Sequence, residues 1–312
     1  MKISGAFGSS AAVEALQAHD FAGAEVTTEL EQVSPVHTAF PAVVNEQRYD
    51  LAELAIVTFL QALDAGRPLC LLPVTLLGRF QHHCVVTMDG SGVDSAADLA
   101  GKRVGVRSWS QTTGVWVRGF LAGDYGLDLG QVEWITYEPA HVAGAIDPAG
   151  ITRAPAGAKL TADFLDGRLD AAILGNQLPD DPRIRTVLAD PAREAAAWYG
   201  RTGAVPINHM MAASEDFVAE NGALITGICR AVAATVPATP RISSTPDLYP
   251  SGFDAVAPAL DLVSRYAFDQ GVIAKALPAD QIQARTERLA GVRLGDLNVT
   301  TSDPVGQPGH GR

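Results

Sequence analysis

Two histidines stand in extended segments where an imidazole could transfer a proton to a bound small molecule. His209 lies in RTGAVPINHMM, where Pro206 keeps the backbone extended, and it is our first candidate for a general acid. The alternative is a histidine held structurally by a backbone carbonyl group. His82 is the second candidate, either as the acid or as a donor that orients the ligand. His83 beside it would point to the opposite face of a strand, so one of the two would face the site.

A glutamate follows the strand-like run at the start of YDLAELA. The carboxylate of Glu53 could hydrogen-bond a phenol, hold one tautomer of a histidine, or cap the helix that follows. The first two roles belong to acid–base chemistry and the third is structural. The predicted catalytic residues are therefore His209, His82 and Glu53.

Arginine and threonine side chains near these segments could bind a carboxylate group. Arg79 and Arg201 could supply the paired N–H donors that planar carboxylates favour, although Arg201 could instead cap a helix or pair with Glu194. Thr112 and Thr113 open a predicted helix, whose free backbone N–H groups form an anion site. The predicted substrate-binding residues are Arg79, Arg201, Thr112, Thr113, Ser110 and Arg107.

The elements that would position these residues alternate between apolar strand-like runs and helical patterns, which is typical of βαβ units. A helix should begin at Ser9 or Ser10, with a serine as its N-cap. Strands are expected at residues 2–8, 24–30, 68–74, 102–106, 132–138, 170–175 and 184–190. Further extended segments are expected at 82–88 and 204–214.

These two extended segments bracket a self-contained βαβ block, which indicates a second lobe inserted into the first. We expect an α/β fold of two lobes, each a mixed sheet flanked by helices, with two crossing hinge strands. Lobe I would comprise residues 1–84 and 207–298, lobe II residues 85–206, and residues 299–312 a flexible tail. The predicted ligand site is the cleft between the lobes, where strand ends and helix N-termini converge.

Charge and composition exclude several kinds of partner. The net charge of −12 and the pI near 4.9 argue against nucleic acid and anionic membrane surfaces, because both attract basic proteins. No stretch approaches the ~20 apolar residues of a membrane span, and no apolar run near the start has the composition of a secretory signal. We therefore expect a cytoplasmic protein that binds a small molecule. The three cysteines lack metal-like spacing, and Cys70 and Cys84, which lie in apolar strand-like runs, are expected to be buried free thiols.

Several stretches resemble the 4,5-dihydroxyphthalate decarboxylase family, a cytoplasmic branch of the type II periplasmic-binding-protein-like fold. The most specific features are RTG-x-x-PI-x-H, YP-x-G and VWVRG followed by DYG. The matching stretches in chain order are YDLAELA (49–55), PLCLLPV (68–74), FQHHCVV (80–86), GKRVGV (101–106), TTGVWVRGFLAGDYGLD (112–128), LDGRLDAAI (165–173), WYGRTGAVPINHMM (198–211), YPSGFDA (249–255) and RYAFDQG (265–271).

The resemblance implies a carboxy-lyase that needs no metal and no organic cofactor, acting on a hydroxylated aromatic or similarly conjugated acid. His209, Glu53 and Arg201 match positions of the family, and His82 matches the histidine of its F-x-H motif. The family places an arginine one residue before Arg79. In this scheme an arginine clamps the carboxylate and a histidine delivers the proton. A homo-oligomer is also implied.

Departures from the family pattern point to a substrate other than dihydroxyphthalate. Neutral and cationic residues replace an acidic one at 107–110, GSS (8–10) replaces expected aspartates, Val256 and Ala257 replace Asn and Arg, and Phe268 replaces His. Two other functions remain open. One is a non-catalytic solute-binding protein for a carboxylate, and the other is a different elimination on a carboxylated molecule, as in menaquinone-pathway relatives of this fold.

Overall fold

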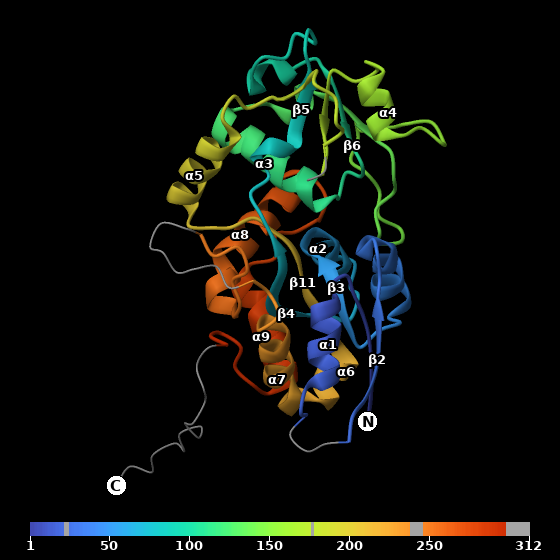
Figure 1. Ribbon diagram of the computed structural model, residues 1–312, viewed down its shortest axis with the longest axis vertical. Helices are drawn as coiled ribbons and strands as arrows, with labels where there is room; N and C mark the ends of the chain where they lie inside the picture. Colours follow the sequence, from blue (N-terminus) through green and yellow to red (C-terminus); the bar gives the residue numbers. More distant parts are fainter. Residues whose placement is uncertain (22–24, 176–177, 238–245, 298–312) are drawn as a thin grey trace.

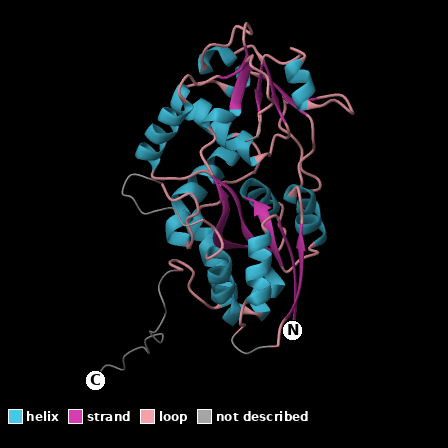
Figure 2. Ribbon diagram, viewed as in Figure 1, coloured by secondary structure: helices cyan, strands magenta, loops and turns pink. Residues whose placement is uncertain are grey.

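The strands form two separate sheets that lie toward opposite ends of an elongated molecule (Figures 1 and 2). The computed structural model describes residues 1–21, 25–175, 178–237 and 246–297. The sheet of lobe I contains, in spatial order, β2 (Thr27–Gln32), β1 (Lys2–Phe7), β3 (Leu51–Ala55), β11 (Ile207–Ser214) and β4 (Leu69–Gly78). The sheet of lobe II contains β10 (Ile184–Thr186), β5 (Val85–Met88), β9 (Ala171–Ile173), β6 (Arg103–Val106), β7 (Glu133–Thr136) and β8 (Thr152–Arg153). The predicted two-lobed α/β fold with mixed sheets is therefore confirmed.

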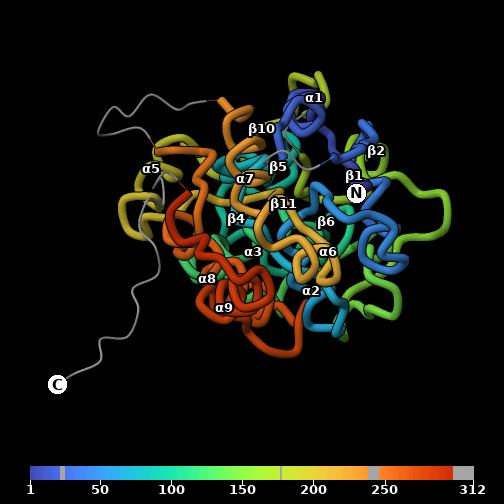
Figure 3. Tube along the Cα trace, turned by 90° about the horizontal axis from the view of Figure 1, so that it is seen from below, coloured from blue at the N-terminus to red at the C-terminus, as the bar shows by residue number. Residues whose placement is uncertain are grey.

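In lobe I, β1 runs parallel to β2 and β3, whereas β11 runs antiparallel to β3 and β4. Every residue of β3 is buried, which explains why its sequence LAELA lacks the polar–apolar alternation of a half-exposed strand. Helices α7, α8 and α9 pack against β4, and α2 packs against β3 and β11 (Figure 3). The helices of this lobe are α1 (Ser10–Ala18), α2 (Ile56–Asp64), α6 (Glu215–Glu220), α7 (Gly222–Ala233), α8 (Phe253–Asp269) and α9 (Ala279–Ala290).

In lobe II, β6 lies parallel to both β7 and β9, and β5 lies antiparallel to β9 and β10. Its helices are α3 (Thr112–Tyr125), α4 (Leu160–Leu165) and α5 (Pro191–Thr202). Helix α3 is buried along most of its length, so VWVRGFL is apolar on nearly every face. The parallel strands β6, β7 and β9 end together on the side of the sheet where α3 begins.

Local sequence signals account for several helix ends. Ser9 caps α1, as predicted, and its Oγ accepts a hydrogen bond of 3.3 Å from the N–H of Ala12. Asp190 caps α5 in the same way, with Pro191 in the first turn. Helices α3 and α5 end at glycines with φ of +66° and +64°, Gly126 and Gly203, a conformation that side chains with a Cβ rarely adopt.

The segment predicted to be extended at 82–88 divides into two parts. Residues His82–Cys84 form a 3₁₀ turn, closed by a hydrogen bond of 3.0 Å from the N–H of Cys84 to the carbonyl of Gln81, and β5 begins only at Val85. The prediction was wrong for the turn because the chain leaves the sheet of lobe I here and must change direction before it enters the other. His82 and His83 therefore do not alternate between two faces of a strand.

Hydrogen bonds and packing join the two lobes. The indole of Trp116 in α3 donates to the carbonyl of Ile207 at 2.9 Å, and Trp109 donates to the carbonyl of Gln270 at the same distance. The main apolar core contains residues of both sheets, and a smaller core beside α4 belongs to lobe II. Because the core is continuous, sheet membership alone does not show that each lobe folds as a unit, and the predicted domain limits stay a prediction.

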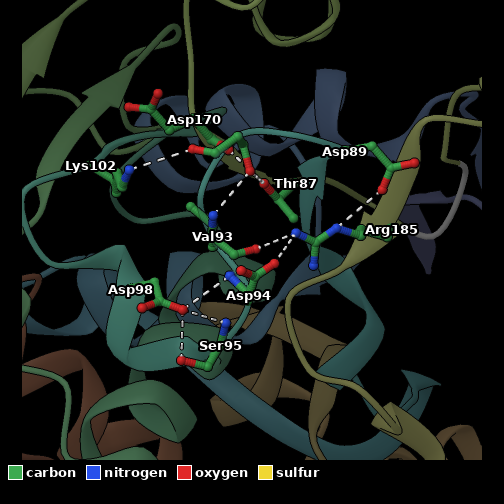
Figure 4. A network of polar contacts seen from close by, with 10 residues as sticks. Thr87, Asp89, Val93, Asp94, Ser95, Asp98, Lys102, Asp170 and Arg185 are labelled. Carbon is green, nitrogen blue, oxygen red and sulfur yellow. Dashed lines mark hydrogen bonds and ion pairs between the residues drawn. The ribbon is translucent and has the colours of Figure 1, made fainter.

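A polar network fixes the end of lobe II that lies farthest from the other lobe (Figure 4). Arg185 of β10 bonds to the carboxylate of Asp94 at 2.7 Å and pairs with Asp89 at 3.2 Å. Thr87 of β5 donates to the carbonyl of Asp170 at 2.8 Å. The network joins the ends of β5, β9 and β10 and includes the fully buried Thr87, and it stabilises this end of the sheet.

Three further expectations concern thiols, membranes and the chain end. Cys70, Cys84 and Cys229 are buried free thiols, and the expectation for the first two is confirmed. Within the described residues, none of the helices combines the length and apolar character required to cross a membrane. The predicted flexible tail lies outside the described residues.

Candidate functional site between the two sheets

The shortest polar contact between two predicted catalytic residues joins His209 of β11 to Glu53 of β3. The distance from His209 Nδ1 to Glu53 Oε1 is 2.6 Å, and Glu53 is only 6% exposed. Its second oxygen accepts a hydrogen bond of 2.9 Å from the N–H of Gly8. Burial by itself would raise the pKa of Glu53, but the hydrogen bond and charge of His209 and the N–H of Gly8 outweigh it and lower that pKa. The carboxylate is therefore ionised at neutral pH.

An ionised carboxylate only accepts hydrogen bonds, so Nδ1 of His209 must carry the hydrogen. Its Nε2 remains the nitrogen that can exchange a proton with another group, and the side chain is 17% exposed. Of the three predicted roles for Glu53, the structure favours holding a histidine tautomer. A Cβ at position 8 would lie 3.2 Å from the Glu53 carboxylate and 3.1 Å from Val36, so a side chain there would crowd the carboxylate.

Two further histidines lie beside this pair and were not selected from the sequence. The ring of Phe40 meets His209 edge-on at 5.6 Å and His141 edge-on at 5.3 Å. The ring of His37 lies 6.4 Å from that of His141. Thr58, in the first turn of α2, contacts Nδ1 of His141 through its hydroxyl at 3.1 Å. The site thus contains three imidazoles and one carboxylate.

Burial, then the positive charge of Arg107, lowers the pKa of His37 and lowers that of His141 to about 4. Both imidazoles are therefore neutral at pH 7. A sequence signal for them does exist, since His37 follows β2 and His141 follows β7 at the carboxyl ends of parallel strands, where ligand sites form in α/β folds. That signal is weak, because many loop residues share it.

The first turns of helices α2 and α3 meet at this site. Thr112 in the first turn of α3 accepts a hydrogen bond of 3.3 Å through its hydroxyl from the N–H of Val57 in α2. Ser110, just before α3, lies with its hydroxyl 3.4 Å from that of Ser108. Arg107 donates to Glu138 at 3.0 Å. Two helix N-termini and a cation give this region a positive potential that favours an anionic group.

A second group of predicted and unpredicted residues surrounds Arg79 where β4 leaves lobe I. One guanidinium nitrogen of Arg79 donates to Thr113 at 3.4 Å, and the same hydroxyl accepts from Asn208 at 3.4 Å. Gln81 donates to the carbonyl oxygen of the Asn208 side chain at 2.6 Å. Nε and Nη1 of Arg79 are buried and have no hydrogen-bond partner among the described residues.

His82 lies in a different environment from His209. It is 2% exposed, stacked on Phe120 at 4.2 Å between nearly parallel rings, with Trp198 at 6.1 Å. Burial lowers its pKa to about 4, and Nδ1 has no hydrogen-bond partner among the described residues. A neutral imidazole enclosed by aromatic rings has no proton to deliver at pH 7, so this geometry favours a structural role over the predicted catalytic one.

Arg201 lies on the surface, at the last turn of α5. Its guanidinium pairs with Asp124 of α3 at 2.7 Å, and its side chain is 53% exposed. The surface alternative considered from the sequence is therefore favoured, with a different partner. Glu194 instead accepts a hydrogen bond of 3.0 Å from Tyr125. The structure does not bring Arg201 together with His209, Glu53 or Arg79.

A pocket of about 410 Å³ adjoins the site at Arg107. It opens at the carboxyl ends of β6, β7 and β9, the position expected for ligands in such sheets. The polar residues in its lining include Arg107, Gln111, Tyr137, Glu138, Lys159 and Thr161. In the described part of the chain, no group of three or more His, Cys, Asp or Glu side chains is arranged to hold a metal ion.

Two sheets of mixed strand direction, joined by crossing segments with polar groups between them, define the type II periplasmic-binding-protein architecture. A solved structure shares it: the periplasmic aliphatic sulphonate binding protein SsuA from Escherichia coli superposes with a TM-score of 0.53, covering 93% of this chain and 99% of that chain. The sequence identity is 15%, so this likeness concerns the fold. No family model matches the chain.

Sequence comparison identifies a more specific relationship. The chain is 28% identical over 265 residues to the 4,5-dihydroxyphthalate decarboxylase of Comamonas testosteroni, which covers 79% of this chain and 80% of the relative. It is 33% identical over 164 residues to the 4,5-dihydroxyphthalate decarboxylase of Pseudomonas putida, covering 48% of this chain and 63% of that protein. The protein is therefore a distant homologue of 4,5-dihydroxyphthalate decarboxylases.

Proposed function

We propose that this protein is a cofactor-independent decarboxylase of a hydroxylated aromatic, or similarly conjugated, carboxylic acid. The observation that carries the proposal is the buried His209–Glu53 pair, with 2.6 Å between Nδ1 and Oε1, beside two helix N-termini. The carboxylate holds the Nδ1 hydrogen of His209 in a hydrogen bond, which leaves Nε2 as the nitrogen that can pass a proton to a bound acid. The decarboxylase relatives support the same reaction class.

The carboxylate of the substrate would bind to Arg79 and to the N-terminus of α3. Arg79 carries two buried N–H groups without a partner among the described residues, and leaving a buried charge unpaired is costly. Thr113 connects Arg79 to the first turn of α3, so the cation and the helix N-terminus lie side by side. A bound carboxylate would satisfy both, which explains why a cation is tolerated there.

His209 would deliver the proton. A hydroxyl group ortho or para to the reacting carbon donates electron density to the ring, and that carbon takes the Nε2 proton of the charged imidazole. The C–C bond to the carboxylate then breaks, its electron pair restores the aromatic ring, and CO₂ leaves. His209 is then neutral, and its Nδ1 keeps the hydrogen that it donates to Glu53. Its Nε2 takes up one proton from water, so the net change is one proton consumed and one CO₂ released.

The substrate is proposed as a class because the residues around the site differ from the family pattern. Where the resemblance leads one to expect aspartates after the first strand, Gly8 supplies a backbone N–H to Glu53 and Ser9 caps α1. The site therefore has fewer negative charges on this side. The expectation of a cytoplasmic location stays a prediction, and cell fractionation with an antibody to the chain tests it.

The test is a two-stage screen of aromatic mono- and dicarboxylates, with and without ortho or para hydroxyl groups. Thermal shift first identifies acids that stabilise the protein, and CO₂ release is then measured with those acids after treatment of the protein with a chelator. We expect turnover of hydroxylated acids and its loss in His209→Gln, with His82→Phe as the matched histidine control. Stabilisation without CO₂ from any acid would overturn the proposal.

That contrary result would favour a second function, a carboxylate-binding protein without turnover. The shared architecture with the sulphonate-binding protein is the observation that supports it. The two functions differ in what His209→Gln changes. A binding protein loses affinity for the acid, whereas a decarboxylase loses turnover while it still binds the acid through Arg79.

A further inference from the structure

Hydrogen bonds from lobe I hold a loop of lobe II at His141 and Ala143. The side-chain amide of Asn45 donates to the carbonyl of His141 at 2.8 Å and accepts from the N–H of Ala143 at 2.8 Å. The hydroxyl of Thr58 contacts Nδ1 of the imidazole at 3.1 Å. Asn45 and Thr58 belong to lobe I, whereas residues 141–143 lie between β7 and β8 of lobe II. These bonds form only when the lobes are close together.

The amide of Asn45 is matched to this loop in both of its polar atoms. Its NH₂ group faces a carbonyl and its oxygen faces an N–H, so a flipped amide would lose both bonds. Val142, between the two bonded residues, is 2% exposed and part of the core. The main chain around His141 is thus held on both sides, which fixes where the imidazole lies.

The imidazole lies among the chemical groups of the site. Its ring and that of His209 both meet the ring of Phe40 edge-on, so the two imidazoles flank one aromatic side chain. The charged and titratable groups around it are His37, Arg107 and His209, with Glu138 paired to Arg107. With one nitrogen on Thr58, the other remains to contact a ligand.

We infer that His141 is a substrate-contacting residue that binds a ring hydroxyl group, and that Asn45 holds it there when the lobes are closed. A neutral imidazole has one donor and one acceptor, and a phenolic hydroxyl also has both, so the two are complementary. His209, which contacts the same Phe40 ring, then acts on the carboxylate-bearing carbon. The inference rests on the proposed function, because it specifies what the same site recognises.

The experiment measures binding in the His209→Gln background, in which the proposed mechanism makes turnover slow enough to measure binding. Isothermal titration calorimetry compares 4,5-dihydroxyphthalate with phthalate, two acids that differ only in their hydroxyl groups. We expect the dihydroxylated acid to bind more tightly, and His141→Ala to remove roughly 3- to 12-fold of that preference, the value of one neutral hydrogen bond. Affinity for phthalate should remain within about twofold.

Substitutions at two further positions, Thr58 and Asn45, separate contact from positioning. Thr58→Val removes the hydroxyl on Nδ1 and should reduce the same preference, whereas Thr58→Ser should retain it. Asn45→Ala should weaken both acids and also reduce the preference, because it releases the loop that positions His141. Circular dichroism and thermal unfolding test whether each variant is folded. If His141→Ala does not fold, the comparison of Thr58→Val with Thr58→Ser still tests the inference.

The outcomes distinguish this inference from the function on which it rests. If the preference for the hydroxylated acid persists undiminished in both His141→Ala and Thr58→Val, the inference is overturned while the carboxylate site stands. If the parent protein binds the two acids equally, the inference also fails. If it binds neither acid, the proposed function fails for aromatic dicarboxylates and the inference falls with it.

Discussion

His209 and His82 are the same residue type in adjacent crossing segments, yet their surroundings give them opposite properties. His209 contacts an ionised carboxylate at 2.6 Å and is partly exposed. His82 stacks on Phe120 in a pack of aromatic rings, and burial lowers its pKa to about 4. The first environment orients an imidazole beside a carboxylate, and the second encloses a neutral imidazole among aromatic rings.

The difference comes from backbone conformation and not from the histidine itself. His209 lies in β11, paired with β3, and this pairing brings it beside the strand that carries Glu53. His82 lies in a 3₁₀ turn that leaves the sheet and directs the ring toward α3 and α5. A pairing of strands distant in sequence therefore makes a candidate acid, and a local turn makes a core residue.

Replacing His209 should have the largest effect on activity. His209→Gln removes the proton donor but keeps a polar side chain of similar length, and we expect CO₂ release to fall roughly 10²- to 10⁴-fold. His209→Ala should regain part of that activity with added imidazole. His82→Phe should retain activity within about threefold. Activity in His209→Gln within tenfold of the parent would mean that another group delivers the proton.

Replacing Glu53 tests whether its carboxylate accounts for the difference in function between His209 and His82. Glu53→Gln keeps hydrogen-bonding atoms near Gly8 and His209 but removes the charge, so we expect a loss of roughly 10²-fold in kcat with a smaller change in KM.

The His209–Glu53 pair should also stabilise the fold. Because the pKa of Glu53 is lowered on folding, its contribution is present above about pH 4.5 and is lost as the pH falls below that value.

Urea unfolding at two pH values measures that contribution. At pH 7 we expect Glu53→Gln to lower the free energy of unfolding by about 1.5–3 kcal/mol, the range for hydrogen bonds to a charged group. At pH 3.5 the difference from the parent should shrink. An equal difference at both pH values would show that the loss comes from packing and not from the charge.

Replacing His82 should change the pH dependence of stability. The unfolded chain binds a proton at His82 near its ordinary pKa of 6.5, whereas the folded chain binds it near 4, so stability falls as the pH drops from 6.5 to 4. At pH 5 this costs about 2 kcal/mol. His82→Phe keeps the stacking on Phe120 and should recover most of that loss.

Unfolding free energies at pH 7 and pH 5 test this prediction. His141, whose pKa is also lowered to about 4, stays in the variant, so some pH dependence should persist. A variant with the same decrease as the parent between the two pH values would contradict the assignment of His82 as a buried neutral imidazole. Unchanged CO₂ release is the second expected result, because the ring lies in the aromatic pack and not beside Glu53.

Several of these features could be predicted from the sequence because they depend on neighbouring residues. The first strand and the Ser9 cap follow from local composition, and Pro206 before His209 indicates an extended segment. Glu53 was predicted to follow a strand-like run and to lie at the site, and the structure places it within β3. The exact bond between them could not be predicted, since it depends on β11 pairing with β3 across 156 residues.

The site residues that could not be predicted from the sequence lie on loops that the fold brings together. His37 and His141 carry no local pattern, and the position of His141 depends on Asn45, which is 96 residues away. The turn at His82–Cys84 was also missed, because an apolar run with β-branched residues has the composition of a strand even where the chain must change sheets. Local propensity does not contain that tertiary constraint.

The smallest effect is expected at Arg201. Like His82, it was predicted as a site residue, and the structure places it away from His209, Glu53 and Arg79. Arg201→Ala removes an exposed ion pair with Asp124, which is worth about 0.2–1 kcal/mol, and should leave the affinity for aromatic acids within about twofold. Arg79→Gln is the matched variant, since it removes a buried cation and should weaken the affinity roughly 10-fold or more in the same calorimetric titration. Equal losses in the two variants would place Arg201 in the substrate site after all and break the division between cleft and surface groups.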